Sequence, residues 1–225
     1  MFILGIIIIL SYLVGSIPTS IIVSKLSRGI DIRNYGSGNA GGTNVMRILG
    51  WKHGVFVILL DALKGVLAVI VVARLHHGAV PFENATPFDD FTLVQIIAGI
   101  AAVIGHIWTV FAGFRGGKGI ATALGMLLMI VTVDMLVAVG IFIIVVTLSR
   151  YVSLGSIIAA LSVPLTLIVR ENLFHVDVPG YNTLLPFVII TSLLVVYTHR
   201  KNVVRLLNGS ETRISFSKKK TTSAL

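Results

Sequence analysis

The sequence predicts an all-α integral membrane protein, and three observations support that class: its composition, its long apolar runs and its one-sided distribution of basic residues. Hydrophobic residues make up 56% of the 225 positions, charged residues only 12%, and the mean hydropathy is +0.98. Soluble domains usually carry about 25% charged residues. A chain this apolar would expose large hydrophobic patches in water, so a lipid bilayer is its expected solvent.

Charges, Gly clusters and Pro separate the apolar runs that we expect to span the membrane. These runs lie near residues 2–23, 54–75, 92–112, 120–133, 135–148, 152–169 and 184–198. The stretch 120–148 is longer than the roughly 20 residues that cross a bilayer once, and its only charge is Asp134. An unpaired carboxylate inside lipid costs about 2.5–3.5 kcal/mol. We therefore expect two short helices that turn at Val133-Asp134, and about seven spans, with five as the alternative.

The basic residues predict the orientation, because cytoplasmic loops collect Lys and Arg. Of the 18 basic residues, all but Lys64, Arg74 and Arg170 fall on one side of the expected arrangement. This places the N-terminus outside and the C-terminus in the cytoplasm. The net charge of +9 then indicates topology and contact with anionic lipid, not nucleic-acid binding. We expect one polytopic membrane domain over residues 1–214 and a basic, disordered cytoplasmic tail over 215–225.

Several polar residues lie outside the main motifs. Asp61 and Lys64 are i and i+3 inside one span, so we expect them to neutralise each other as a buried pair. His106, near the end of the third span, is expected to be a hydrogen-bonded packing residue. His76 and His77 have no second cluster of ligands, so we predict no metal site and no cofactor. The chain has no Cys, which excludes disulfides and thiolate chemistry.

Three polar segments lie on the predicted cytoplasmic side. The first polar segment, 36–47, holds four glycines within seven positions, which favours a turn whose N–H groups bind an anion. Its expected ligand-binding groups are Ser37, Gly38, Asn39, Gly41, Gly42, Thr43, Asn44 and Arg47. A flexible linker is the alternative interpretation. The match to a dinucleotide-binding GxGxxG fingerprint is discounted, because the segment follows a membrane span and not a strand.

The second polar segment, 113–119, is also rich in glycine and carries Arg115 and Lys118. It fails the P-loop pattern, since Ala112 and Gly119 replace the first Gly and the Ser/Thr that would hold magnesium. We expect Gly116, Gly117 and Lys118 to bind an anion near the N-terminus of the following helix. A loop that is basic only for topological reasons is the alternative.

The third polar segment, 199–211, follows the last span. If the helix continues, His199 and Asn202 share one face at i and i+3, and His199 could carry a proton near neutral pH. Glu211 is the only acidic residue of this segment. The alternative is a collar of basic residues at the membrane surface.

Together the segments resemble the PlsY family, the bacterial acyl-phosphate:glycerol-3-phosphate acyltransferases. The matching stretches are GSGNAGGTNVMRILG at 36–50, GHIWTVFAGFRGGKGIAT at 105–122 and HRKNVVRLLNGSE at 199–211, with smaller similarities at 15–20, 61–65 and 149–157. The family usually has Pro where this chain has Ala40 and Thr109, and commonly Ala at Gly42. These departures remove no charged side chain.

The resemblance implies seven transmembrane helices in the bacterial inner membrane, with the active site on the cytoplasmic side. It implies transfer of an acyl chain from acyl phosphate to the 1-hydroxyl of glycerol 3-phosphate, giving lysophosphatidic acid and phosphate. Ser37, Arg47, Lys118, His199 and Asn202 would be catalytic. The residues that would bind substrate are Gly38, Asn39, Gly41, Gly42, Thr43, Asn44, Gly116, Gly117 and Glu211. His199 could act as a base, or it could position the hydroxyl while the donor's phosphate takes the proton. A phosphate-ester transporter is the alternative function.

Overall fold

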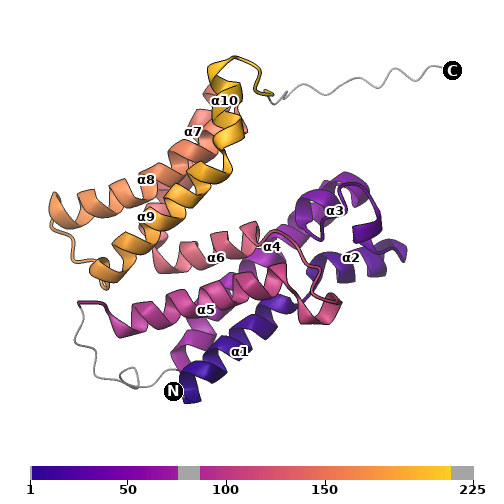
Figure 1. Cartoon of the computed structure of the whole chain (residues 1–225), viewed down its shortest axis with the longest axis horizontal. Helices are drawn as coiled ribbons and strands as arrows, with labels where there is room; N and C mark the ends of the chain where they lie inside the picture. Colours follow the sequence, from indigo (N-terminus) through magenta and orange to yellow (C-terminus); the bar gives the residue numbers. More distant parts are fainter. Residues whose placement is uncertain (1, 76–86, 214–225) are drawn as a thin grey trace. The chain divides into compact units, whose positions relative to one another are not determined.

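The computed structural model describes residues 2–75 and 87–213, and the chain divides into two compact units that meet in sequence at Thr132 and Val133. The first unit holds α1 (Phe2–Ser16), α2 (Thr19–Arg28), α3 (Gly42–Leu49), α4 (Trp51–Leu67), α5 (Asp90–Ile107) and α6 (Ile120–Ile130). The second holds α7 (Thr132–Ser149), α8 (Val152–Asn172), α9 (Tyr181–Thr198) and α10 (Arg200–Leu207). Figure 1 shows the helices of both units, and each unit is described by itself.

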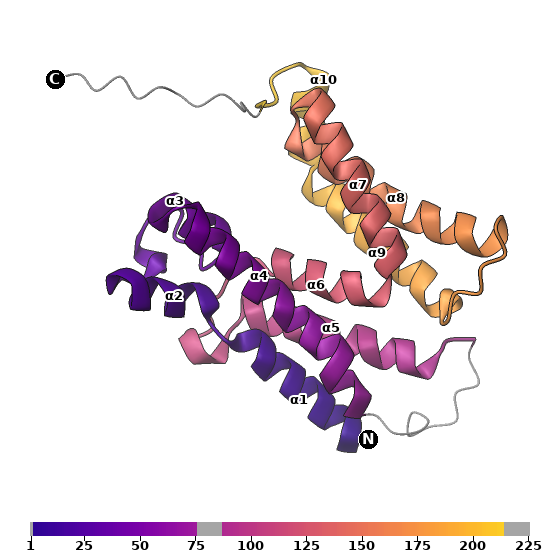
Figure 2. The ribbon, with the colours of Figure 1, turned by 180° about the vertical axis from the view of Figure 1, so that it is seen from behind.

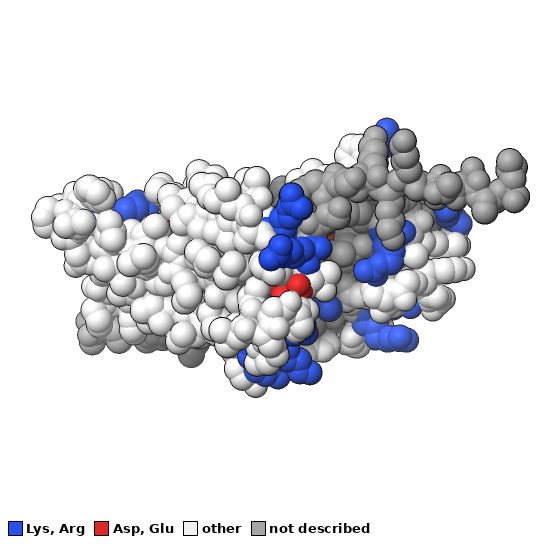
Figure 3. Space-filling view, turned by 90° about the horizontal axis from the view of Figure 1, so that it is seen from above, with Lys and Arg blue, Asp and Glu red and all other residues white. Residues whose placement is uncertain are grey.

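The predicted all-α membrane class is confirmed, because the described residues contain helices and no strand. Within the described ranges, six helical stretches are long and apolar enough to cross a membrane: Phe2–Arg28, Trp51–Leu75, Asp90–Ala112, Thr132–Ser149, Val152–Asn172 and Tyr181–Thr198. The apolar α6 has only 11 residues, about 16 Å at 1.5 Å per residue. Helices α8 and α9 expose large apolar side chains such as Leu165 and Leu194, as helices that face lipid do. In Figure 3 most of the visible surface is uncharged, and Lys and Arg gather in a few groups.

The expected turn at Val133-Asp134 lies earlier in the structure. Helix α6 ends at Ile130 and α7 begins at Thr132, so Asp134 lies in the first turn of α7 and is fully buried. Burial is possible because Arg170 of α8 donates from Nη1 to Asp134 Oδ2 over 2.6 Å. The carboxylate therefore remains inside a helix because another helix supplies its counter-charge. The stretch 120–148 forms two helices, as expected, but the cost of an unpaired carboxylate is not the reason, because Asp134 has Arg170 as its partner.

Glycines bring the helices of the first unit into close contact. Figures 1 and 2 show α1 alongside α5, and α4 alongside α6. A Cβ on Gly105 of α5 would lie 2.1 Å from the carbonyl oxygen of Tyr12, and one on Gly125 of α6 would lie 1.9 Å from that of Ala62. Small residues let membrane helices approach this closely. These contacts hold the polar residues of α4 and α5 near the end of α1.

The first span is interrupted between α1 and α2. Pro18 has no N–H to donate, and it leaves carbonyl groups of the preceding turn without intrahelical partners. Two side chains bind carbonyl oxygens at this break. Lys64 Nζ donates over 2.5 Å to the Ile17 oxygen, which also accepts from the Thr19 N–H over 2.9 Å, and the Thr109 hydroxyl donates to the Ser16 oxygen. Thr109, which stands where the family usually has Pro, therefore fastens the loop after α5 to this break.

The second unit is a smaller helical bundle. Ser192 Oγ of α9 donates to the Ala160 oxygen of α8 over 2.6 Å, and the Arg170–Asp134 pair joins α8 to α7. Helix α10 follows α9 after a break at His199. The predicted tail over 215–225 and the residues His76 and His77 lie outside the described residues.

Candidate functional site

The backbone of the first polar segment differs from the expected row of left-handed glycines. Gly36 and Gly38 have positive φ values of 60° and 72°, the region that glycine adopts most easily. Gly41 is extended with φ −138°, and Gly42 is the first residue of α3. The segment is therefore a turn at Gly36–Gly38 that leads into a helix N-terminus. Only part of the expected anion-binding turn is formed by left-handed backbone.

Asn44 holds this turn together. It is 1% exposed, and its Nδ2 donates to the oxygens of Ile32 and Tyr35 over 3.2 and 2.9 Å. Its Oδ1 accepts from the Ser37 N–H over 3.0 Å. The amide of Asn44 is therefore used to fold the loop, and contact of Asn44 with substrate stays a prediction.

Several groups of the first polar segment remain available to a ligand. The side chains of Ser37, Thr43 and Arg47 are exposed, and neither hydroxyl has a hydrogen-bond partner among the described residues. The N–H groups of Gly42 and Thr43 lie in the first turn of α3, where no intrahelical acceptor exists. Arg47, one turn further along α3, makes only a 3.4 Å contact with Asn44 Oδ1. This combination of free donors and a cation suits an anion.

The first and second polar segments lie together in the first unit. Arg33, just before the first segment, donates from Nη1 to the Ala112 oxygen over 2.8 Å. Arg33 is held in turn by Asp31, with 2.7 Å between Nη2 and Oδ2. The hydrogen bond from Arg33 lowers the pKa of Asp31 below its usual value, so the pair stays ionised at neutral pH.

The second polar segment contacts the end of α5. The N–H groups of Gly116 and Gly117 donate to the oxygens of Ile107 and His106 over 3.0 and 3.1 Å. A Cβ on Gly116 would lie 1.9 Å from the His106 oxygen. These glycines therefore allow close packing, and the expectation that their N–H groups bind the ligand is revised. Lys118 is exposed and has no hydrogen-bond or ion-pair partner within 2–75 and 87–213.

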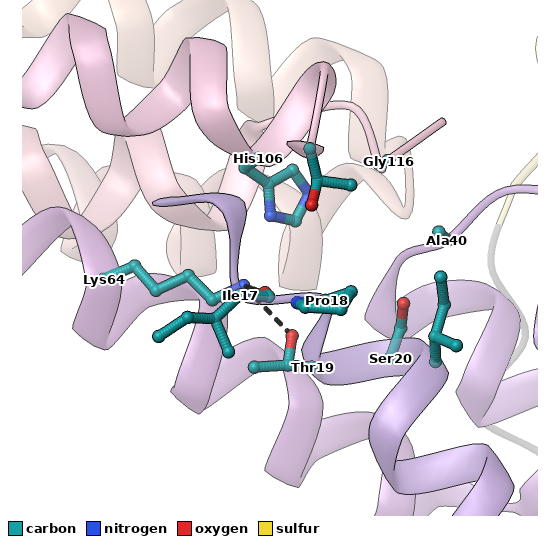
Figure 4. A pocket seen from close by; sticks show the side chains of 11 residues that line it. Ile17, Pro18, Thr19, Ser20, Ala40, Lys64, His106 and Gly116 are labelled. Atoms are coloured by element: carbon teal, nitrogen blue, oxygen red, sulfur yellow. Dashed lines mark hydrogen bonds between the residues drawn. The ribbon is translucent and has the colours of Figure 1, made fainter. Parts of the chain in front are cut away.

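A small pocket in the first unit lies between the two segments and the helix break. Its lining comes from the α1–α2 break, α4, α5 and both segments: Ile17, Pro18, Thr19, Ser20, Ile21, Ala40, Lys64, His106, Thr109, Gly116 and Gly117. In Figure 4 the Lys64 side chain reaches Ile17 and Thr19, and His106 lies beside Gly116. The predicted Asp61–Lys64 pair is confirmed at 2.6 Å.

The third polar segment belongs to the second unit. The helix does not run through it without a break, since α9 ends at Thr198 and α10 begins at Arg200. His199 and Asn202 are nevertheless linked, because the Asn202 N–H donates to the His199 oxygen over 2.8 Å. His199 Nδ1 lies 2.8 Å from the Val195 oxygen. A carbonyl can only accept, so Nδ1 is the donor in this hydrogen bond.

Glu211 organises the segment after α10. Its Oε1 accepts from Asn202 Nδ2 and Ser153 Oγ over 2.9 and 2.7 Å, and its Oε2 accepts from Arg205 Nε over 2.7 Å. The hydrogen bonds, from Asn202 first, lower the pKa of Glu211 to about 2. Three partners contact the carboxylate, which indicates a positioning role toward Asn202, while substrate binding by Glu211 stays a prediction.

Sequence reasoning missed some of the residues that order these segments. Ser153 is the partner of Glu211 in α8, and Thr19 contacts the Asp61–Lys64 pair. Both lie in stretches that resemble the family, 149–157 and 15–20, and that resemblance was the only available signal. Arg33 was counted as a topological charge, and nothing in the sequence indicated its contact with the Ala112 oxygen.

Apolar helices with exposed anion-binding groups define an integral membrane protein that handles an anionic ligand. The model of a family described as glycerol-3-phosphate acyltransferase matches residues 5–209. The chain belongs to this family and is an acyltransferase.

Relatives and solved structures agree with this assignment. A glycerol-3-phosphate acyltransferase of Chlorobium chlorochromatii is 45% identical, with 94% of this chain and 97% of the relative covered. One of Chlorobaculum tepidum is 48% identical, with 95% and 97% covered. Crystal structures of PlsY (YgiH) in its glycerol 3-phosphate form and its lysophosphatidic acid form each give a TM-score of 0.67, with 94% of this chain covered. Their identities are 36% and 35%, and 96% and 95% of those chains are covered.

The hydrogen bonds of Glu211 predict how the end of the chain responds to mutation and pH. Glu211→Gln keeps the shape but loses the charge, so limited trypsin digestion should cleave after Arg205 or Arg213 faster than in the wild type. A lowered pKa contributes stability that is complete above the ordinary value and is lost as the pH falls through about 2. An acid-active protease at pH 4 should therefore still find this segment protected in the wild type.

Asp177→Asn is the matched control, because Asp177 is exposed and has no hydrogen-bond or ion-pair partner in the part of the chain that the structure describes. Its digestion should match the wild type. Equal protection of the Glu211→Gln protein would contradict the positioning role.

Proposed function

We propose that the chain transfers an acyl group from acyl phosphate to the 1-hydroxyl of glycerol 3-phosphate. The products are lysophosphatidic acid and inorganic phosphate, so the reaction starts phospholipid synthesis. The observation that carries the proposal is that Arg47 and Lys118 lie on two adjoining polar segments, both exposed and without a carboxylate partner among the described residues. Two such cations favour ligands that carry phosphate. The family assignment supports glycerol 3-phosphate as the acceptor.

Direct attack accounts for the residues better than a covalent enzyme intermediate. The chain has no Cys, and its sequence has no Ser-His-Asp pattern that would activate a serine. In the proposed step the glycerol oxygen forms a bond to the acyl carbon, and the bond from that carbon to the phosphate oxygen breaks. The departing phosphate accepts the hydroxyl proton. Neither coenzyme A nor acyl carrier protein is required as the donor.

Each polar segment has a proposed role. The residues from Gly38 to Gly41 and the N-terminus of α3 hold phosphate, together with Ser37 and Thr43. Arg47 and Lys118 bind phosphate and stabilise the charge that develops in the tetrahedral transition state. His199 orients the glycerol hydroxyl, and Asn202 assists, so that the proton of this hydroxyl is available to the departing phosphate. Positioning is favoured over base catalysis because no described carboxylate contacts His199.

An assay in detergent tests the function. Purified protein would receive labelled glycerol 3-phosphate with acyl phosphate, acyl-coenzyme A or acyl carrier protein thioester in parallel reactions. We expect labelled lysophosphatidic acid with acyl phosphate alone. Product with a thioester but not with acyl phosphate would contradict the proposed donor. Because detergent leaves no sealed compartment, any lipid product excludes pure transport, and failure with all three donors would favour the transporter.

We infer that the three polar segments face the cytoplasm of a bacterial inner membrane. The support is the distribution of basic residues, of which all but Lys64, Arg74 and Arg170 fall on the predicted side of these segments. Nucleic acid is not an expected partner, and membrane lipid is.

The orientation can be tested with single cysteines in this Cys-free chain. Asn34 and Asp177 are both exposed, and we expect an impermeant thiol reagent on intact cells to label Asp177→Cys but not Asn34→Cys. Permeabilised cells should label both positions, which controls for reactivity. Labelling of Asn34→Cys in intact cells would reverse the proposed orientation.

A further inference from the structure

A buried polar cluster in the first unit has no part in the proposed chemistry. Its members are Thr19, Asp61, Lys64 and His106, which are 8%, 1%, 4% and 7% exposed. All four lie within stretches that are long and apolar enough to span the membrane. Charged side chains in such stretches are costly, and proteins keep them where they serve a purpose.

The cluster is joined by several hydrogen bonds, which indicates a fixed structure. Lys64 Nζ donates to Asp61 Oδ1 over 2.6 Å, to Thr19 Oγ1 over 3.2 Å and to the Ile17 oxygen over 2.5 Å. An ammonium group has three protons, so every one is used. Thr19 Oγ1 in turn donates to Asp61 Oδ1 over 2.5 Å. The α1–α2 break and α4 are therefore joined at one point.

His106 connects the cluster to both polar segments. Its Nδ1 lies 3.4 Å from Asp61 Oδ1, and its backbone oxygen accepts from the Gly117 N–H over 3.1 Å. A Cβ on Gly117 would lie 2.2 Å from His106 Nε2 and 2.8 Å from the Ala40 oxygen. The imidazole ring thus packs on the residue before Lys118, and the first polar segment contacts the same residue at Ala40.

We propose that this cluster is a positioning device, in which Asp61 and Lys64 fix His106, and His106 fixes the two polar segments that carry Arg47 and Lys118. A buried ion pair gives little net stability over an apolar replacement, so geometry is the better reason for its presence. The consequence for catalysis rests on the proposed function. The ordering of the two segments does not rest on the proposed function, and it can be measured without an activity assay.

The first test uses Ala40→Cys as a reporter. Ala40 is 5% exposed, so a thiol there should react slowly while the segments are in place. Adding Lys64→Met, or the milder Thr19→Val if that protein is unstable, should raise the labelling rate about tenfold or more, as expected for a local opening equilibrium shifted by about 1.4 kcal/mol.

Asp134→Asn is the matched control, because it breaks the other buried ion pair, which joins α7 to α8 in the second unit. It should lower the thermal stability and leave the thiol rate unchanged. Unchanged rates in both Lys64→Met and Thr19→Val, or an equal increase in Asp134→Asn, would overturn the proposal.

The second test is a double-mutant cycle on kcat/KM for glycerol 3-phosphate. If His106 acts through the segment that carries Lys118, the effects of His106→Gln and Lys118→Ala should not be independent. The loss of kcat/KM in the double variant should be about tenfold smaller than the product of the two single losses. For Asp134→Asn and Lys118→Ala, the loss of kcat/KM in the double variant should equal the product of the two single losses. If the losses of kcat/KM from His106→Gln and Lys118→Ala simply multiply, the positioning role of His106 is contradicted. If no variant, the wild type included, makes product, the proposed function has failed, and the thiol rates alone decide whether the segments are ordered by the cluster.

Discussion

The buried ammonium group of Lys64 needs three acceptors, and much of the first unit is arranged to supply them. One acceptor is a carboxylate on its own helix, one is a hydroxyl from α2, and one is a carbonyl that the Pro18 break exposes. No water is available in the apolar part of a bilayer to replace a missing partner. The position of the break relative to α4 is therefore fixed by hydrogen bonding. The first and second polar segments pack beside this break.

Carbonyl groups at the ends of membrane helices have a second use in this protein. The end of α5 exposes the oxygens of His106 and Ile107, which receive the N–H groups of Gly117 and Gly116. The second polar segment folds back on its own helix, so its polar backbone is satisfied within the protein, and Lys118 is left exposed. In the second unit, Glu211 provides the acceptor groups for Asn202 and Arg205. In both units, residues with no direct role in the chemistry hold the candidate catalytic side chains.

The sequence predicted what depends on local pattern. Apolar runs gave the helices, the i, i+3 spacing gave the Asp61–Lys64 pair, and Asp134 indicated a helix break close to the one at Val131. It did not predict what depends on helix packing. Arg170 as the partner of Asp134 required the contact of α7 with α8, and the loss of free N–H groups at Gly116 and Gly117 required the loop to fold back. Asn44 was expected to bind substrate because an amide suits that role. Its structural role became visible only from the hydrogen bonds that its Nδ2 donates to the Ile32 and Tyr35 oxygens.

The central hypothesis is that the protein catalyses direct transfer by binding phosphate groups and positioning a hydroxyl. Its most direct test is a single-turnover experiment with acyl phosphate that carries a label in the acyl chain. In the absence of glycerol 3-phosphate, we predict no phosphate release and no label on the protein. When the acceptor is added, phosphate and labelled lysophosphatidic acid should appear together in equal amounts. A burst of phosphate equal to the amount of protein, with the label bound covalently to the chain, would contradict the account.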